Sequence, residues 1–405
     1  MRSIIWPGWK SKQPFQEIGR RLQYISKKKT IGMFAKVDRC MIGQGAASFV
    51  DPHTVEVADE QITGRKIFIC AGTRPEIPKF PGIESIDMLT NENLFHLDGV
   101  PDSLIVVGGG STACEMAQAF ARLGSKVTII IRGPRIMWRE DIESTDIIER
   151  SFEADGITIL REQNPTGFSK KGDRVIMTTD RGEMIEAARV LVAAGRRMDF
   201  DAMRLDRAGV RHTVRGITVN KRLQTSCRHI YACGDCNGYH QYSHAAMHQG
   251  MIALMNSMMP PLMKFDFRKY VVPWTMFTDP QISRAGMSLR ELEAAGTKKY
   301  ETITINYEDY GAAIAESVDV GHIKALVSPT LGRIYGVTIV GEGSGEMINE
   351  WALAIQNRLT MRHILFQQHS FPTMGFLTKR AGETWTMNRM QSGFLKKMCR
   401  FMFRM

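Results

Sequence analysis

The residues of this chain with the most specific chemistry are three small residues that follow an apolar run. Gly108, Gly110 and Ala113 have the spacing G-x-G-x-x-A and come directly after Leu104-Ile-Val-Val107. Between a strand and a helix, the first glycine makes a tight turn, the second lets the backbone approach a pyrophosphate, and the third small residue permits close packing. The N-terminus of the following helix adds N–H donors and a positive dipole. The pattern predicts a dinucleotide-binding turn.

Arg132 bears on which dinucleotide this turn binds. It follows the apolar run Lys126-Val-Thr-Ile-Ile-Ile131, and no acidic residue occurs before Glu140. An acidic residue at this place binds the ribose 2′-hydroxyl of NAD, whereas an arginine accommodates the 2′-phosphate of NADP. We therefore expect NADPH to be preferred over NADH. The alternative is that Arg132 is only a solvated strand end.

Two of the seven cysteines, Cys233 and Cys236, form a C-x-x-C pair. Such a pair is compatible with redox chemistry or with half of a zinc site. No second pair and no nearby histidine pair completes a tetrahedral site, so we expect no metal. An odd number of cysteines spread over a long chain does not indicate a disulfide framework.

The elements that position these residues follow from apolar periodicity. Residues 103–131 read as strand, glycine turn, helix and strand, which is a βαβ unit of a parallel sheet. Helical spacing of Phe15, Ile18, Leu22 and Ile25 predicts an amphipathic helix that ends at the lysines 27–29. After residue 265, the alternating segments 302–306, 322–327 and 333–340 predict antiparallel strands, and 344–356 predicts a helix. Together they indicate a separate α+β domain.

Taken in chain order, the motifs resemble those of the pyridine nucleotide-disulfide oxidoreductases, which include glutathione reductase, dihydrolipoamide dehydrogenase and mercuric reductase. Segment 69–75 resembles a turn that contacts FAD, segment 108–115 the NAD(P) motif, 194–196 a second glycine turn, 225–235 the FAD signature, and 272–280 with 333–341 the dimerisation domain. Gly43-Gln-Gly45-Ala46 resembles a loop that passes the adenine. Trp138-Arg-Glu-Asp141 is most similar to mercuric reductases.

The resemblance implies an α/β protein with the two-dinucleotide-binding flavoprotein fold and a C-terminal α+β dimerisation domain. The implied parts are a partial FAD-binding domain (1–99), a Rossmann NAD(P)-binding domain (100–200), a return segment of the FAD domain (201–264), the dimerisation domain (265–385) and a basic tail (386–405). The implied cofactors are FAD and NADP. The implied cofactor-binding residues are Gly45, Gly72, Thr73, Gly108, Gly110, Ala113, Glu115, Arg132, Gly195, Gly234 and Asp235.

In the family, the aspartate at the position of Asp235 hydrogen-bonds the ribityl chain, and the glutamate at the position of Glu115 lies near the nicotinamide. An aspartate-bearing turn also accounts for Cys233 and Cys236, so the resemblance disfavours a redox C-x-x-C.

The chain departs from the family in three ways. No strand–GxGxxG–helix unit precedes residue 100, so we expect an N-terminally shortened FAD domain. The redox pair C-x4-C does not occur; Cys399 resembles C-terminal thiols of mercuric reductases, or is incidental. The catalytic His and Glu of the family motif His-x-His-Pro-Thr-x-x-Glu correspond here to Phe371 and Phe376, whereas His369 is retained. A nicotinamide-gating tyrosine corresponds to Ser111.

The resemblance predicts an NAD(P)H oxidoreductase that transfers hydride from NADPH through FAD to an unknown acceptor, and it predicts a homodimer. The catalytic residues are not identified. The alternative is a catalytically inactive, NADP-binding and dimerising remnant. Because one of two expected phosphate-binding turns is missing, we expect weak FAD binding, retained NADP binding, and no disulfide or mercuric reductase activity.

Composition limits the remaining function classes. The chain has 405 residues, of which 43% are hydrophobic and 23% charged, as in folded soluble proteins. No apolar run approaches the roughly 20 residues needed to cross a bilayer. No signal peptide is recognised, so the expectation is a cytoplasmic protein. The net charge of +11 is concentrated in part at 27–29 and 396–404, and such an excess attracts nucleic acid or anionic membrane in some proteins. No nucleic-acid-binding motif occurs, so no nucleic-acid partner is expected. Contact of the basic tail with an anionic membrane surface is left as an alternative.

Overall fold

The computed structural model describes residues 12–31, 37–391 and 401–403. The chain divides into two compact units, each assembled from separate stretches of sequence. The first unit comprises Met1–Asp102, Gly167–Ile176 and Glu186–Lys269. The second comprises Ser103–Thr166, Met177–Ile185 and Tyr270–Met405.

The first unit is built on short strands. A three-stranded antiparallel sheet is formed by β1 (Ser48–Asp51), β2 (Thr54–Val57) and β3 (Glu60–Thr63). A parallel pair is formed by β4 (Ile67–Ile69) and β16 (Ile230–Ala232), with Ile67 opposite Ile230 and Ile69 opposite Ala232. Antiparallel pairs are formed by β5 (Arg74–Pro75) with β13 (Arg196–Arg197) and by β14 (His212–Thr213) with β15 (Gly216–Ile217).

The helices of the first unit include the predicted amphipathic helix, α1 (Gln13–Ile25). Of its apolar face, Phe15 is buried, whereas Leu22 and Ile25 are exposed. The helix does not end in coil at the lysines, because π-helical turns continue through Ser26–Ile31. The other helices are α5 (Ser243–Met258) and the 3-10 turns η2 (Ile83–Ser85), η3 (Leu94–His96), η4 (Asp201–Met203), η5 (Gly234–Asn237), η6 (Pro261–Met263) and η7 (Phe267–Lys269).

The second unit begins with the predicted βαβ unit, which is confirmed. Strands β6 (Ser103–Val107), β7 (Lys126–Ile131) and β8 (Thr158–Arg161) are parallel, with Ser103 opposite Lys126. They alternate with α3 (Ser111–Arg122) and α4 (Ile142–Ala154). Every residue of β6 is buried, as expected for a central strand covered on both faces. Strands β9 (Pro165–Lys171), β10 (Arg174–Thr179), β11 (Met184–Ala187) and β12 (Arg189–Val192) follow, where the chain passes between units.

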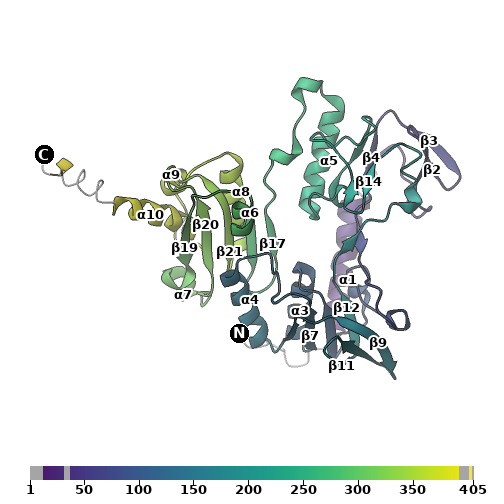
Figure 1. Cartoon of the computed structure of the whole chain (residues 1–405), viewed down its shortest axis with the longest axis horizontal. Coiled ribbons are helices and arrows are strands. Elements are labelled where there is room, and N and C mark those ends of the chain that lie inside the picture. Colours follow the sequence, from purple (N-terminus) through teal and green to yellow (C-terminus); the bar gives the residue numbers. More distant parts are fainter. Residues whose placement is uncertain (1–11, 32–36, 392–400, 404–405) are drawn as a thin grey trace. The chain divides into compact units, whose positions relative to one another are not determined.

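The C-terminal part of the second unit is a five-stranded antiparallel sheet (Figure 1). Its order is β17 (Trp274–Met276), β18 (Ile282–Gly286), β21 (Ile334–Val340), β20 (His322–Val327) and β19 (Glu301–Asn306). The alternating segments that predicted this α+β region therefore form strands.

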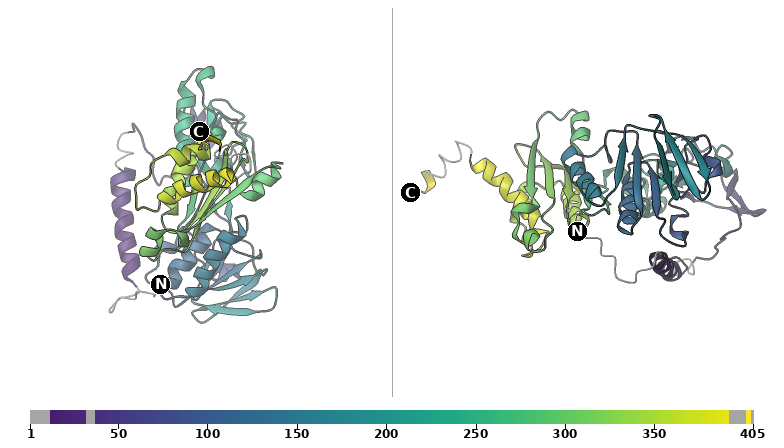
Figure 2. Two further views of the ribbon diagram at one scale, coloured as in Figure 1. Left: turned by 90° about the vertical axis from the view of Figure 1, so that its left-hand side faces the viewer. Right: turned by 90° about the horizontal axis from the view of Figure 1, so that it is seen from below.

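Helices cover this sheet and complete its core. Helix α8 (Ser344–Gln356) packs on β18 and β21, and its Trp351 is fully buried. Helices α9 (Met361–Phe366) and α10 (Phe376–Met390) pack against each other, and α10 contacts β19 and β20 (Figure 2). Short elements α6 (Leu289–Ala294), η8 (Tyr307–Asp309) and α7 (Gly311–Ala315) connect the strands. Among the described residues, no helix is both long and apolar enough to span a membrane.

Candidate functional site

The glycine turn of the second unit has the geometry of a phosphate cradle. Gly108 follows β6 with a φ of 126°, and its N–H donates to the carbonyl of Ile130 at 3.0 Å. A Cβ added to Gly109 would lie 2.7 Å from Cγ2 of Ile131, whereas one added to Gly110 would meet no atom within 4 Å. The backbone of Gly110 therefore faces open space, and Ala113 packs inward, fully buried. A ligand phosphate can approach this backbone closely.

The N-terminus of α3 lies at this turn. Gly110 is the N-cap residue, and no side chain caps the helix. An uncapped helix start leaves N–H donors of the first turn free, and its dipole favours an anion. The backbone donors and the dipole at this turn thus fit a dinucleotide pyrophosphate. Ser111, at the position of the family's gating tyrosine, is the first residue of α3.

Arg132 lies beside the glycine turn as the first residue after β7. Its side chain is exposed, and it has no hydrogen-bond or ion-pair partner among the described residues. Arg135, in contrast, contacts Asp146 at 2.6 Å and the hydroxyl of Thr145 at 3.0 Å. Arg139 lies over the ring of Trp138. Arg132 is therefore a free guanidinium at the end of β7.

Glu115 is fixed by a contact that the sequence did not indicate. Its Oε1 accepts a hydrogen bond from the backbone N–H of Phe277 at 2.8 Å. Burial raises the pKa of the Glu115 carboxyl, and the Phe277 bond opposes that shift. One turn further along α3, Gln118 exchanges hydrogen bonds with the backbone of Asp279, and Arg122 contacts the Asp279 carboxylate at 2.6 Å. Helix α3 is thereby tied to the segment after β17.

In the first unit, three residues that are far apart in sequence form one polar cluster. The hydroxyl of Thr73 donates to Oδ2 of Asp235 at 2.9 Å. Arg196 donates to the Thr73 hydroxyl at 2.5 Å and to its carbonyl at 2.9 Å. Arg196 also lies 3.5 Å from Oδ2 of Asp235. Thr73 and Asp235 are predicted site residues, but Arg196 is not. In the sequence, only its position next to Gly195 in the second glycine turn could have indicated that Arg196 belongs to this cluster.

Strand geometry brings this polar cluster together. Thr73 follows β4 and Asp235 follows β16, and parallel strands end at the same edge of a sheet. The N–H of Gly234 donates to Oε1 of Gln249 at 2.9 Å, which fixes the turn on α5. Gly72 has a φ of +66°, and an added Cβ there would meet no atom within 4 Å. This edge can accept the hydroxyl-bearing chain of a flavin nucleotide.

Gly45 is not part of this cluster. It lies three residues before β1, and no hydrogen bond joins it to Thr73 or Asp235 in the described part of the chain. Because a strand follows Gly45, its loop does not open a helix. Among the described residues of the first unit, no α-helix begins directly after a strand and a glycine turn. The Thr73–Arg196–Asp235 cluster thus fits the ribityl end of FAD. The described residues of the first unit form no comparable site for the FAD pyrophosphate.

The C-terminal motif carries two phenylalanines that contact each other. The rings of Phe371 and Phe376 lie 5.2 Å apart at 74°, an edge-to-face arrangement. His369 contacts Oε1 of Glu350 at 2.9 Å through Nε2 and is nearly buried. Neither phenylalanine can transfer a proton, so acid–base chemistry has no carrier at these two positions.

The cysteines are arranged differently from a C-x-x-C redox pair. Every described cysteine is free. Cys236 donates to the carbonyls of Ile69 at 3.4 Å and of Cys233 at 3.2 Å. Cys233 instead lies beside Cys70, at the neighbouring end of the β4–β16 pair, which sequence reasoning missed. The Cys70 thiol is the main cause of a raised pKa of Cys233. Among the described residues, no group of three or more His, Cys, Asp or Glu side chains is placed to hold a metal ion.

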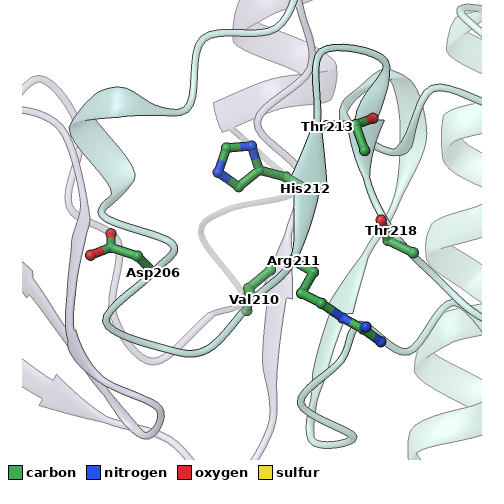
Figure 3. A pocket seen from close by; sticks show the side chains of 6 residues that line it. All are labelled: Asp206, Val210, Arg211, His212, Thr213 and Thr218. Carbon is green, nitrogen blue, oxygen red and sulfur yellow. The ribbon is translucent and has the colours of Figure 1, made fainter.

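The first unit also has a pocket of about 490 Å³, and none of the predicted site residues lines it. It is lined by Asp206, Val210, Arg211, His212, Thr213 and Thr218. The polar ends of Asp206, Arg211 and His212 point in different directions (Figure 3), so they do not converge on a ligand.

A buried parallel strand with an open glycine turn, a Thr–Arg–Asp cluster at a second sheet edge and an antiparallel C-terminal domain define an α/β protein of the class that binds two nucleotides. Residues 9–250 match the family profile described as pyridine nucleotide-disulphide oxidoreductase, and residues 272–381 match the dimerisation domain of that family. The chain belongs to the pyridine nucleotide-disulphide oxidoreductase family. The family and fold class predicted from the motifs are confirmed.

Two curated relatives show the extent of the match. The chain is 30% identical to a mercuric reductase of Staphylococcus aureus over 350 residues, which cover 84% of this chain and 63% of that protein. It is also 30% identical to the dihydrolipoyl dehydrogenase of Bacillus subtilis (strain 168) over 378 residues, which cover 88% of this chain and 77% of that protein. The match thus spans less than two thirds of the mercuric reductase.

Solved structures share the fold. The HOCl-induced flavoprotein disulfide reductase RclA from Escherichia coli superposes with a TM-score of 0.84 at 24% identity, over 93% of this chain and 86% of that chain. LpdA from Mycobacterium tuberculosis superposes with a TM-score of 0.82 at 23% identity, over 91% of this chain and 83% of that chain.

Proposed function

We propose that this chain binds NADPH and FAD in a flavoprotein oxidoreductase that transfers hydride from NADPH through FAD to an acceptor. Membership of an oxidoreductase family supports the reaction class. The observation that carries the proposal is that one chain has two separate features of different design, each of which fits part of a dinucleotide. One is the uncapped α3 N-terminus beside Arg132, and the other is the cluster around Asp235.

At the NADPH site, backbone and charge do the binding. Gly108 and Gly110 hold the pyrophosphate against the α3 N-terminus, and Ala113 lets the helix pack closely on the sheet. Arg132 neutralises the 2′-phosphate. No acidic residue that could select the 2′-hydroxyl of NAD instead occurs between Arg132 and Glu140. Glu115, held by the Phe277 amide, is the family's residue near the nicotinamide.

At the flavin site, Asp235 accepts a hydrogen bond from a ribityl hydroxyl. Its Oδ2 already faces Thr73 and Arg196, so the carboxylate is held in one orientation before the ligand arrives. Gly72 and Gly195 keep the neighbouring backbone free of side chains. FAD, when bound, supplies the two-electron acceptor for the hydride.

The acceptor is a small molecule or a disulfide, and no residue of this chain is assigned to it. Phe371 and Phe376 exclude the acid–base pair that the family uses at these positions. We also propose a homodimer, because residues 272–381 match the family's dimerisation domain.

The proposal is tested with purified protein, saturating NADPH, ferricyanide as electron acceptor and increasing FAD. We expect NADPH oxidation that rises with added FAD. Asp235→Ala should raise the FAD concentration for half-maximal rate by about tenfold or more, the scale of a charge-assisted hydrogen bond. Asp206→Asn, an exposed carboxylate of the same unit, is the matched control and should leave the curve unchanged.

A second candidate function is a catalytically silent protein that binds NADP and dimerises. The Phe371–Phe376 contact favours it, because two phenylalanines stand where the family keeps its acid–base pair. The same assay separates the candidates. NADPH binding without FAD-dependent oxidation at saturating FAD would support the silent protein and refute the oxidoreductase.

A further inference from the structure

Cys70 and Cys233 occupy equivalent places at the ends of two paired strands. In the parallel pair β4–β16, Ile69 lies opposite Ala232, and Cys70 and Cys233 are the next residues of the two strands. The pairing continues one step further, because the N–H of Cys233 donates to the carbonyl of Ile69 at 3.0 Å. Neighbouring strands lie about 4.8 Å apart, which is inside the Cα–Cα range of about 4.4–6.8 Å that a disulfide spans. Partners in register also point to the same face of the sheet.

The two thiols differ in access to solvent. Cys70 is exposed, whereas Cys233 is 3% exposed. The third nearby cysteine, Cys236, is fully buried and donates its S–H to two backbone carbonyls. A reagent in solution therefore reaches Cys70 first, and Cys233 reacts only after Cys70 has formed a mixed disulfide.

The mutual influence of the two thiols favours the same division of roles. The neighbouring thiol of Cys233 lowers the pKa of Cys70 to about 7. The neighbouring thiol of Cys70, followed by burial, raises the pKa of Cys233 well above its ordinary value. Burial raises the pKa of Cys236 to about 11. Cys70 is thus the one thiol of the three that is substantially ionised near neutral pH, and the thiolate is the nucleophile.

We propose that Cys70 and Cys233 form a redox dithiol that exchanges with low-molecular-weight disulfides. The Cys70 thiolate attacks one sulfur of the small disulfide, whose S–S bond breaks and releases one thiolate. Cys233 then gives its proton to solvent and attacks the Cys70 sulfur, and the mixed disulfide releases the second thiolate. The protein thiols lose two electrons and two protons in total, and the small disulfide becomes two thiols.

The position of the pair gives this exchange a structural consequence. Cys70 lies two residues before Gly72, and Cys233 lies two residues before Asp235. A disulfide there would tie together the two turns that form the Thr73–Arg196–Asp235 cluster. The proposal rests on the strand register and the thiols alone, so it does not depend on electron transfer from NADPH.

The experiment uses the full chain, reduced with dithiothreitol, desalted and titrated with glutathione disulfide. After an acid quench, free thiols are alkylated and peptides are mapped by mass spectrometry. We expect a disulfide linking the Cys70 and Cys233 peptides, with the loss of two hydrogen atoms, and its removal by dithiothreitol. Cys40, an exposed cysteine, reports on unselective oxidation.

Two variants separate the roles of the thiols. Cys233→Ala should accumulate a mixed disulfide with glutathione on Cys70, because no second thiol resolves it. Cys236→Ala is the matched control and should still form the Cys70–Cys233 link. In the unmodified protein, a lasting glutathione adduct on Cys70, a Cys233–Cys236 link, or a Cys70 that stays reduced while Cys40 is oxidised would each overturn the proposal. The unmodified protein alone decides these outcomes, whether or not a variant folds.

Discussion

Two arginines near the proposed cofactors differ in what holds them. Arg196 is bonded to Thr73 and lies near Asp235, whereas Arg132 has no partner among the described residues. An arginine without a protein partner loses no intramolecular contact when it binds a phosphate, so its binding energy goes to the ligand. Arg132 is therefore the residue at which the choice between NADPH and NADH is tested.

Arg132→Glu should weaken NADPH binding by about 1–3 kcal/mol, because a phosphate partner is replaced by a repelling carboxylate. NADH lacks the 2′-phosphate, so its affinity should change little. Isothermal titration with both nucleotides measures this. Arg150→Glu, an exposed arginine on α4, is the control. Equal affinities of the unmodified protein for NADPH and NADH would refute the assignment.

The ionisation of Cys70 gives a second prediction for single residues. The rate at which iodoacetamide labels Cys70 should rise as the pH is raised through about 7. Cys233→Ala removes the neighbouring thiol that lowers the pKa of Cys70, so the midpoint should move up toward the ordinary value of 9.0. Peptide-resolved labelling across pH measures both midpoints. An unchanged midpoint in Cys233→Ala, with Cys236→Ala as control, would show that Cys233 does not lower the pKa of Cys70.

Among the elements, helix α3 has two functions in the second unit. Its N-terminus carries no side-chain cap, and one face is bonded to the segment after β17 through Glu115, Gln118 and Arg122. The open end can therefore be altered without disturbing the bonded face. Gly110 allows this, because its backbone is extended and an added side chain would meet no protein atom.

Gly110→Val should abolish measurable NADPH binding while lowering the unfolding temperature by only a few degrees. The valine would occupy the space into which the pyrophosphate must come. Replacing an N-cap glycine by valine costs about 1 kcal/mol in the helix, which is a small part of the stability of a chain of this size. NADPH titration and thermal unfolding measure the two effects. Gly250→Ala, within α5, is the control. Retained binding by a folded Gly110→Val protein would show that the phosphate binds elsewhere.

At the scale of the whole molecule, the 405-residue chain should bind NADPH more firmly than FAD. The described first unit has the Thr73–Asp235 cluster but no helix that opens from a strand and glycine turn. Each missing charge-assisted hydrogen bond is worth roughly 1.5–3 kcal/mol, so two of them change affinity by about a hundredfold or more. Flavin absorbance after dialysis measures retention. Near-stoichiometric FAD would contradict this expectation.

The dimer is the second prediction for the whole molecule. Light scattering at micromolar concentration should give twice the mass of the chain, since residues 272–381 match the family's dimerisation domain. A monomer mass at that concentration would contradict it.

The sequence by itself determined the family and the local elements. Gly108, Gly110 and Ala113 are close in sequence to the strand and helix they join, and apolar periodicity identifies both elements without knowledge of the rest. The same holds for the alternating strands after residue 265. Such signals are local, because the spacing of neighbouring residues decides them.

Tertiary structure alone decided which distant residues meet. Thr73 is 123 residues from Arg196 and 162 from Asp235, yet their side chains form one cluster. The parallel pairing of β4 with β16 brings Asp235 to Thr73, and the antiparallel pairing of β5 with β13 brings Arg196 there. The same pairing places Cys70 beside Cys233, whereas the C-x-x-C spacing in the sequence pointed to Cys236. Strand register fixes these contacts, and register depends on packing across the whole unit, which no local spacing encodes.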